Sequence, residues 1–271
     1  MLLELFRVSL KFSGNLFVTK PPSREDWIRM FFSEHRRFVH RKKVFHFVPE
    51  KNVSGSDGSL LFGYIAREAQ LKERSSPSSG LIPSTHTYWQ AALIVIDPSS
   101  DASGQKIGME YIPLIGQPWP VLSSLFSAMS SHAESVYLAE VHRIAQTGSF
   151  KKWADEQKSG IKKISFDVSS PNMFGDRNDF QNELRSLRDK ENVSRVRTTL
   201  ESDGALNQTD RMEEIADYTE RGAGTLKAVA VDGSKYSSDK HGAEIEIFVP
   251  NHNEDKSGFL SRIFKAIKDV F

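Results

Sequence analysis

The first apolar segment of the chain, residues 2–12, alternates apolar and polar positions over most of its length. Leu3, Leu5, Val8 and Leu10 mark the apolar positions. A period of two is typical of a half-buried β-strand, because successive side chains of a strand point to opposite faces of its sheet. We therefore expect the chain to open with a strand.

The second apolar segment repeats at helical spacing. Ser23 is followed three residues later by Asp26, which is a helix-capping pattern, and Trp27 and Phe31 lie about one helical turn apart. These features predict a helix over residues 24–36 that ends at a group of positively charged residues.

Short apolar runs separated by Gly, Ser and Asp follow, and each of them predicts a strand. They are residues 44–48, 60–66, 88–97 and 107–112. Between the second and the third run, the composition of residues 73–85 (ERSSPSSGLIPST) predicts a mobile loop. Residues 120–131 begin with a proline and predict a helix.

The second half of the chain alternates helical and strand patterns more regularly. Strands are predicted at residues 135–145, 161–170, 194–202, 225–233 and 243–251, and helices at 149–157, 176–192, 208–222 and 257–271. This order predicts an α+β fold in which helices cover one face of a mixed or antiparallel sheet. We expect a β-rich N-terminal domain at residues 1–133 and an α+β C-terminal domain at residues 134–271.

Composition narrows the class of protein. The 271 residues include no cysteine, which excludes disulfides, thiolate nucleophiles and metal sites with sulfur ligands. A formal net charge of only +1 means that any attraction to nucleic acid must come from local clustering. Glu4 and Arg7 interrupt the apolar start, so neither a signal peptide nor a membrane span is expected there. These features favour a cytoplasmic protein.

The densest cluster of charge lies in the stretch EHRRFVHRKKVFHFVPE, residues 34–50. Its five clustered cations are Arg36, Arg37, Arg41, Lys42 and Lys43, and the aromatic residues Phe38 and Phe45 lie among them. Arginine and lysine neutralise phosphates, and an aromatic ring can stack on an unpaired base. The pattern predicts a nucleic-acid-binding edge. The alternative is a solvated helix end, where cations interact favourably with the helix dipole.

A second basic set flanks the junction of the two halves. Its members are Lys151, Lys152, Lys158, Lys162 and Lys163, and acidic residues dilute it. If both sets line one cleft, a nearly neutral protein can still hold DNA or RNA through phosphate contacts.

Other chemistry is less well supported by the sequence. His35, His40 and His46 lack the spacing that places two imidazoles on one metal ion, and we expect neither a metal site nor a cofactor. Arg41 and His46 have the Arg-x4-His spacing that resembles the catalytic motif of HEPN-type ribonucleases. That motif requires a helix, whereas residues 44–48 favour a strand. We expect no enzyme, with a metal-independent ribonuclease as the alternative.

The predicted last helix carries an apolar stripe that includes Phe259, Leu260 and Ile263, with basic residues around it. Such a stripe covers its own sheet in most proteins, and the preceding predicted strand needs a cover. A dimer contact, another partner or a membrane surface are the alternatives.

The order of elements in the second half resembles that of Rex-type phage exclusion proteins and related bacterial anti-phage proteins. The segments concerned are SFKKWAD and ISFDVSSPN, the second followed by a helix, a strand and a long helix. The resemblance implies a non-enzymatic, homodimeric DNA-binding protein that responds to phage infection. We therefore expect sequence-non-specific nucleic-acid binding, with DNA favoured, in phage defence. A protein-interaction subunit that meets a second defence protein and binds no nucleic acid is the other alternative.

Overall fold

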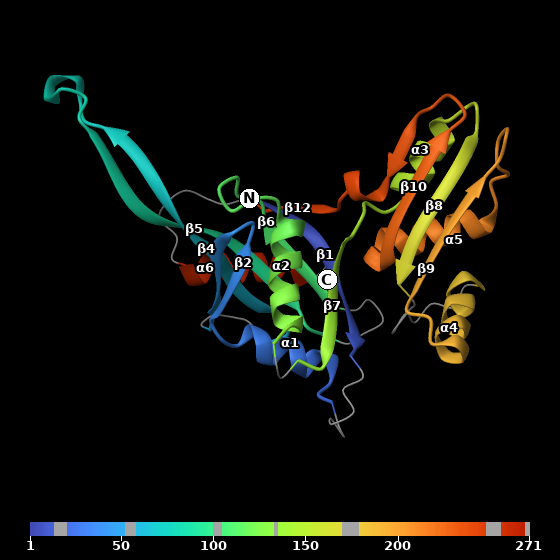
Figure 1. The fold of residues 1–271 in the computed structure, drawn as a ribbon, viewed down its shortest axis with the longest axis horizontal. Helices are drawn as coiled ribbons and strands as arrows, with labels where there is room; N and C mark the ends of the chain where they lie inside the picture. The colour runs from blue at the N-terminus through green and yellow to red at the C-terminus, as the bar shows by residue number, and fades with distance from the viewer. Residues whose placement is uncertain are drawn as a thin grey trace.

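The computed structural model describes residues 1–13, 21–51, 58–99, 105–132, 135–169, 179–247 and 256–268. Within these ranges the strands form one eight-stranded and one four-stranded antiparallel sheet, called here the large sheet and the small sheet (Figure 1). Helices pack on both sheets, so the fold is α+β, as the sequence predicts. None of the helices formed by the described residues has the length and apolar character needed to cross a membrane.

The large sheet is built mainly from the first half of the chain. Its strands are β1 (Leu2–Phe12), β2 (Arg36–His40), β3 (Lys43–Glu50), β4 (Leu61–Arg74), β5 (Pro83–Asp97), β6 (Gln105–Glu110), β7 (Tyr137–Arg143) and β12 (Glu244–Glu246). Their order is β12-β1-β6-β5-β4-β3-β2. β12 pairs with the first residues of β1, and β7 pairs with its later residues, from Phe6 to Phe12. The opening strand forms as its apolar pattern predicts, and the pairing places it between β6 on one side and β12 and β7 on the other.

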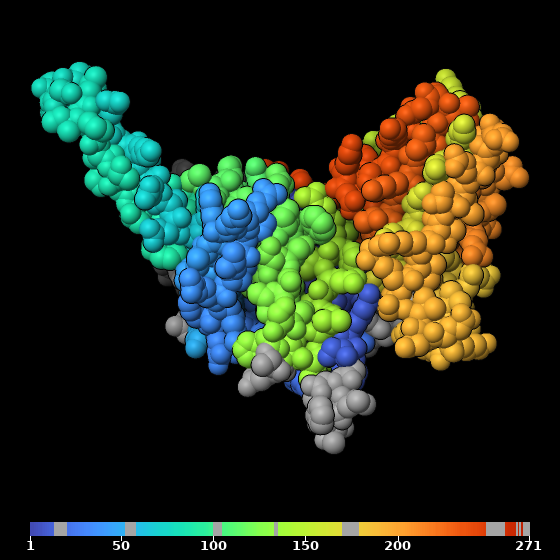
Figure 2. Space-filling view, viewed as in Figure 1, coloured from blue at the N-terminus to red at the C-terminus, as the bar shows by residue number. Residues whose placement is uncertain are grey.

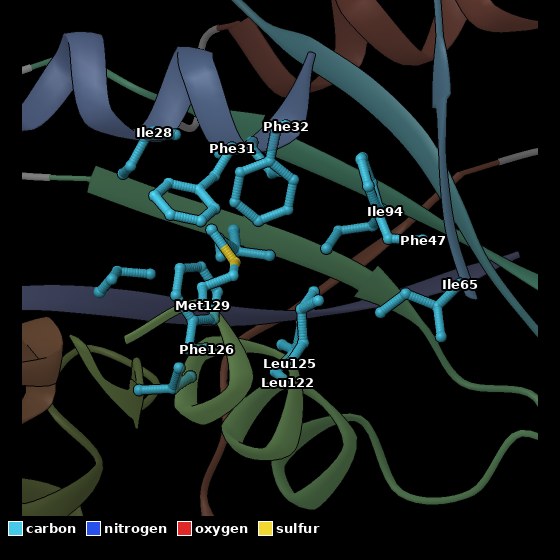
Figure 3. Packing of buried hydrophobic residues seen from close by; sticks show 14 of the residues in the cluster. Ile28, Phe31, Phe32, Phe47, Ile65, Ile94, Leu122, Leu125, Phe126 and Met129 are labelled. Atoms are coloured by element: carbon cyan, nitrogen blue, oxygen red, sulfur yellow. The ribbon is translucent and has the colours of Figure 1, made fainter. Parts of the chain in front are cut away.

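Helices α1 (Arg24–Phe32) and α2 (Pro118–Ser130) cover one face of the large sheet. Figure 3 shows their apolar side chains facing those of the sheet across the main core. Phe32 links the layers, because its ring lies 4.8 Å from that of Phe47 and 5.6 Å from that of Phe126. Truncating a buried phenylalanine typically costs about 3–5 kcal/mol, so this contact is a major source of stability.

Helix α6 (Lys256–Lys268) covers the opposite face of the large sheet. Leu260, Ile263 and Ile267 are fully buried against sheet residues that include Leu3 and Leu93. The apolar stripe of the last helix therefore packs on its own sheet, which is what the preceding strand needs.

The small sheet comprises β8 (Ile161–Ser169), β9 (Arg195–Glu201), β10 (Gly224–Ala230) and β11 (Lys235–Ser237), in the order β11-β10-β8-β9. Helices α3 (Ser149–Glu156), α4 (Asp179–Glu191) and α5 (Asp210–Tyr218) bury apolar residues against one face. A π-helical turn at Thr219–Ala223 leads from α5 into β10. The start of the predicted helix at residues 176–192 lies partly outside the described residues.

The chain crosses from the large sheet to the small sheet after β7 and returns before β12. The two crossing segments pair with each other, because Ala145 bridges Gly242 and the Ala243 N–H donates to the Ile144 carbonyl at 2.8 Å. The predicted division after residue 133 placed β7, β12 and α6 in a C-terminal domain, whereas here they pair with β1 or pack on the large sheet. Such pairing over long sequence separation leaves no local signal.

Two predicted elements differ from the structure. The first helix ends at Phe32 rather than at residue 36, and residues 36–40 form β2 instead, because Phe38 packs into the core and pairs with Phe45 of β3. The predicted loop at 73–85 is largely ordered, since β4 and β5 pair as far as Arg74 and Pro83. Together these strands form a two-stranded ribbon that projects from the body (Figures 1 and 2).

Candidate nucleic-acid interface

The basic stretch forms a tight hairpin. Strands β2 and β3 pair from Arg36 with Phe47 to His40 with Lys43, and only Arg41 and Lys42 connect them. Both connecting residues are left-handed, with φ of 48° and 64°, as a two-residue hairpin turn that matches the strand twist requires. Because α1 ends at Phe32, Arg37, Arg41, Lys42 and Lys43 do not lie at the end of a helix. The helix-dipole alternative is therefore wrong for these four, whereas Arg36 contacts the Phe31 carbonyl in the last turn of α1.

The two phenylalanines predicted to stack on a base are part of the core. Phe38 and Phe45 are 3% and 1% exposed, and their ring centroids lie 5.6 Å apart. Strand alternation directs both rings toward the face that α2 covers. Base stacking by either ring would require it to leave the core, so this part of the predicted site is wrong.

The outward face of the hairpin carries the alternate residues. Val39 of β2 pairs with Val44 of β3, and Arg37 pairs with His46. Val39, Val44 and Val48 are 61%, 37% and 41% exposed. The hairpin face is therefore a row of exposed valines next to an arginine and a histidine, with the cations of the turn at its end.

An aromatic surface unforeseen from the sequence adjoins this hairpin face. Trp89 of β5 is 58% exposed, and its ring lies edge-on to that of His46 with 5.3 Å between centroids. Ala66 of β4 pairs with both His46 and Ala91, and its small side chain leaves space for the indole to reach the imidazole. His46 in turn hydrogen-bonds His35, with 2.9 Å between Nδ1 and Nε2. We call His35, His46 and Trp89 the ring surface.

The cations near the ring surface differ in whether other residues of the protein already hold them. Arg36 is held by the Phe31 carbonyl, which accepts from its Nε at 3.2 Å, and by Glu34, whose carboxylate lies 3.2 Å from Nη2. Its guanidinium also lies 5.0 Å from the centre of the Phe31 ring. Arg36 therefore has a structural role. The cations free to meet a ligand are Arg37, Arg41, Lys42 and Lys43, called here the basic hairpin.

Burial lowers the pKa of His46, and the neighbouring His35 and Arg37 lower it further. A neutral imidazole follows at physiological pH, which suits a ring that hydrogen-bonds a second histidine. The interactions that hold His46 in place therefore also keep it uncharged beside the basic hairpin.

The second basic set does not form one surface. Lys151 and Lys152 lie on α3, which packs against the covered face of the small sheet, and Lys151 pairs with Glu213 at 3.2 Å. Lys163 of β8 points to the opposite face and pairs with Glu201 at 2.9 Å, while Lys162 precedes it on the same strand. In Figure 1, α2 and β7 lie between these elements and the β2–β3 hairpin. The expected single cleft is therefore not formed.

The geometry also bears on the other predicted chemistries. Among the described residues, no group of three or more His, Asp and Glu side chains is placed to hold a metal ion. His40 is 9% exposed and lies 2.8 Å from the Ser124 hydroxyl, on the face opposite to His35 and His46. Arg41 lies in a turn and His46 on a strand, so the helical arrangement of the ribonuclease motif is absent.

Neither a protein-family model nor a curated protein matches this sequence.

Proposed function

We propose that this protein binds nucleic acid through the ring surface and the basic hairpin, with single-stranded DNA as the favoured ligand and no marked sequence preference. The observation that carries the proposal is the exposed Trp89 ring, held edge-on by His46, which pairs with Arg37 of the basic hairpin. Aromatic rings next to cations are the usual means of holding an unpaired strand.

Stacking is the first component of the proposed interaction. A base laid on the open face of Trp89 gains about 1–3 kcal/mol, whichever base it is. Because His46 and His35 fix the tryptophan from one side, the ring loses little conformational freedom on binding. This pre-organisation supports binding without sequence preference.

Phosphate neutralisation is the second component. Arg37 lies directly beside His46, and Arg41 and Lys42 form the end of the same hairpin. Each phosphate contact to a single strand lowers the slope of log affinity against log salt by about 0.7. Three contacts from the basic hairpin would therefore give a contribution of about −2 to that slope.

The test is fluorescence anisotropy with labelled single-stranded DNA, duplex DNA and RNA of equal length, at low and moderate salt. W89A should weaken single-strand binding about 10-fold, while W89F should retain most of it. Changing Arg37, Arg41, Lys42 and Lys43 to glutamine should weaken all three ligands and flatten the salt slope. A control that changes Lys151 and Lys152 of α3 to glutamine should bind as wild type.

The row of exposed valines favours a second candidate function, a protein-interaction subunit. Val39, Val44 and Val48 form an apolar strip of the kind that docks on another protein. If wild type binds none of the three nucleic acids, and V39S with V44S abolishes salt-insensitive capture of a defence protein, this second function replaces the first.

The biological setting is a separate proposal. A role in phage exclusion predicts that expression lowers the plating efficiency of phage and that W89A reverses the effect. A homodimer predicts a mass in light scattering of twice the 30.6 kDa of one chain.

A further inference from the structure

The small sheet is covered on one face only. Residues of β8, β9 and β10 alternate, and those pointing away from α3, α4 and α5 are polar except for Val229. Five cations lie on this open face: Lys163, Arg195, Arg197, Lys227 and Lys235. The four strands contain two acidic residues, Asp167 and Glu201, and both lie on this face. A near-neutral protein thus concentrates positive charge on one sheet face.

A shallow pocket of about 290 Å³ lies in the middle of this face. Its polar lining residues are Ser165, Asp167, Arg197, Thr198, Thr199, Thr225 and Lys227. The register places Ser165 between Thr199 and Lys227, and Asp167 between Arg197 and Thr225. Hydroxyl groups and the Asp167 carboxylate therefore form the floor of the pocket, with the Arg197 guanidinium on one side of β8 and the Lys227 ammonium on the other.

Asp167 orients the two arginines. Its carboxylate accepts hydrogen bonds from Arg195 Nη2 at 2.8 Å and from Arg197 Nε at 2.7 Å. Burial alone would raise the pKa of Asp167, but the hydrogen bonds from Arg195 and Arg197 outweigh it and the pKa is lowered. Arg197 is held through Nε while its side chain is 71% exposed, which leaves its terminal nitrogens accessible. An arginine held in this way is prepared for bidentate contact with an anion.

The lining selects the class of ligand. Hydroxyl, guanidinium and ammonium donors are the groups that bind phosphate oxygens. The one aromatic residue of the pocket, Phe166, is 5% exposed and packs in the core beneath the sheet, so the pocket offers no ring on which to stack a base. Three cations of this face lie beyond the pocket, Lys163 on β8, Arg195 on β9 and Lys235 on β11, and they suit a chain of phosphates better than a single one.

We propose that the open face of the small sheet binds the phosphodiester backbone of nucleic acid, with one phosphate in the pocket between Arg197 and Lys227. This inference rests on the proposed function, which it extends by a second and purely electrostatic contact. The ring surface then supplies base stacking, and the small sheet holds another part of the same strand.

The experiment compares R197Q/K227Q with the control K151Q/K152Q, which changes the same number of charges on the covered side of the small sheet. The probe is a labelled 20-nucleotide poly(dT) strand, measured by anisotropy across a salt series, with circular dichroism to establish folding. The sheet variant should bind at least 10-fold more weakly at low salt, and its salt slope should flatten by about 1.4, which is two contacts of about 0.7 each. R197K/K227R should retain most of the affinity.

Other outcomes separate the two proposals. Loss of binding in R197Q/K227Q, with wild-type binding in the W89A and basic-hairpin variants, supports the small-sheet site and overturns the ring-surface proposal. Wild-type affinity in a folded R197Q/K227Q overturns the small-sheet site. Displacement of the strand by an equal concentration of inorganic pyrophosphate identifies a small-anion site and overturns the backbone assignment.

Discussion

Glu220 accepts a hydrogen bond from the backbone N–H of Phe150 at 2.8 Å and thereby caps the start of α3. The same carboxylate accepts from the Gly148 N–H at 2.7 Å and from the Ser149 hydroxyl at 3.1 Å. Glu220 is 5% exposed and lies in the π-helical turn before β10, more than 70 residues away along the chain. Glu220 therefore connects the start of α3 to the turn that leads into β10.

Replacing Glu220 should therefore destabilise the small sheet. E220A leaves buried N–H groups without an acceptor, and we expect a loss of about 3 kcal/mol in the free energy of unfolding, measured with urea. E220Q keeps one acceptor oxygen and should lose less. The exposed Glu156 at the end of α3 provides the control, since E156A should change stability by less than about 0.5 kcal/mol. Equal stability of E220A and E156A would contradict the role of the cap.

Substitutions in the turn of the basic hairpin should affect stability and nucleic-acid binding in opposite directions. Arg41 and Lys42 hold left-handed backbone conformations that glycine and asparagine adopt more readily. R41N/K42G should raise the free energy of unfolding by about 1 kcal/mol and at the same time weaken nucleic-acid binding. Thermal unfolding and anisotropy on the same samples test both effects. A stabilised variant with unchanged affinity would show that these cations serve the fold alone.

Gly63 of β4 should tolerate no side chain. A Cβ atom there would overlap the Phe47 ring and lie 2.8 Å from the Val48 carbonyl oxygen. Because both neighbours belong to the core strand β3, we expect G63A to cost about 2–4 kcal/mol in urea unfolding. Gly204 has open space around it, so G204A should unfold like wild type. A cost for G204A equal to that for G63A would contradict the packing explanation.

Acid should weaken the fold through two histidines of the hairpin. Burial lowers the pKa of His40, as does the nearby Arg41, and the pKa of His46 is lowered as well. Below about pH 6.5 the two histidines therefore bind more protons in the unfolded chain than in the folded one. Their contribution to the free energy of unfolding is complete above that pH and is lost as the pH decreases.

The measurement is urea unfolding at pH 7.5 and 5.5. H40Q/H46Q should show a smaller difference between the two pH values than wild type does. This comparison is needed because burial also raises the pKa of Glu110, which acts in the opposite direction. An unchanged difference in the double variant would rule out the histidines as its source.

The ribbon formed by the outer parts of β4 and β5 should exchange its amide protons faster than the rest of the large sheet. β3 pairs with β4 only up to Ala66, and β6 pairs with β5 only from Ile94, so the ribbon has two strands and no third. Isolated two-stranded ribbons are marginally stable in water. Hydrogen exchange should show low protection in residues 67–90 and high protection in residues 61–66. Equal protection would indicate that something covers the ribbon in solution.

The sequence identifies elements with strong local patterns and misses what depends on partners. The opening strand and α2 form as their periodicity predicts, whereas Phe38 fits both a helical spacing from Phe31 and an inward strand position. Only pairing with β3 decides between these two. The role of Trp89 has no local signal, because the residue lies in an ordinary strand pattern and its exposure depends on the pairing of β3 with β4 stopping at His46 and Ala66. The alternation of Arg195 and Arg197 on β9 was visible in the sequence, but not the absence of a covering layer.

The return of the chain to β1 has a consequence for synthesis. Leu3 pairs with Ile245, so β1 acquires this neighbour only after the whole of the small sheet has been translated. Until α6 also emerges, the apolar face around Leu3 has no cover from its own chain. Premature termination anywhere in the small sheet would release a fragment that lacks β12 and α6. Its large sheet would expose apolar surface and would be prone to aggregate, so that chaperones or proteases would have to act on it.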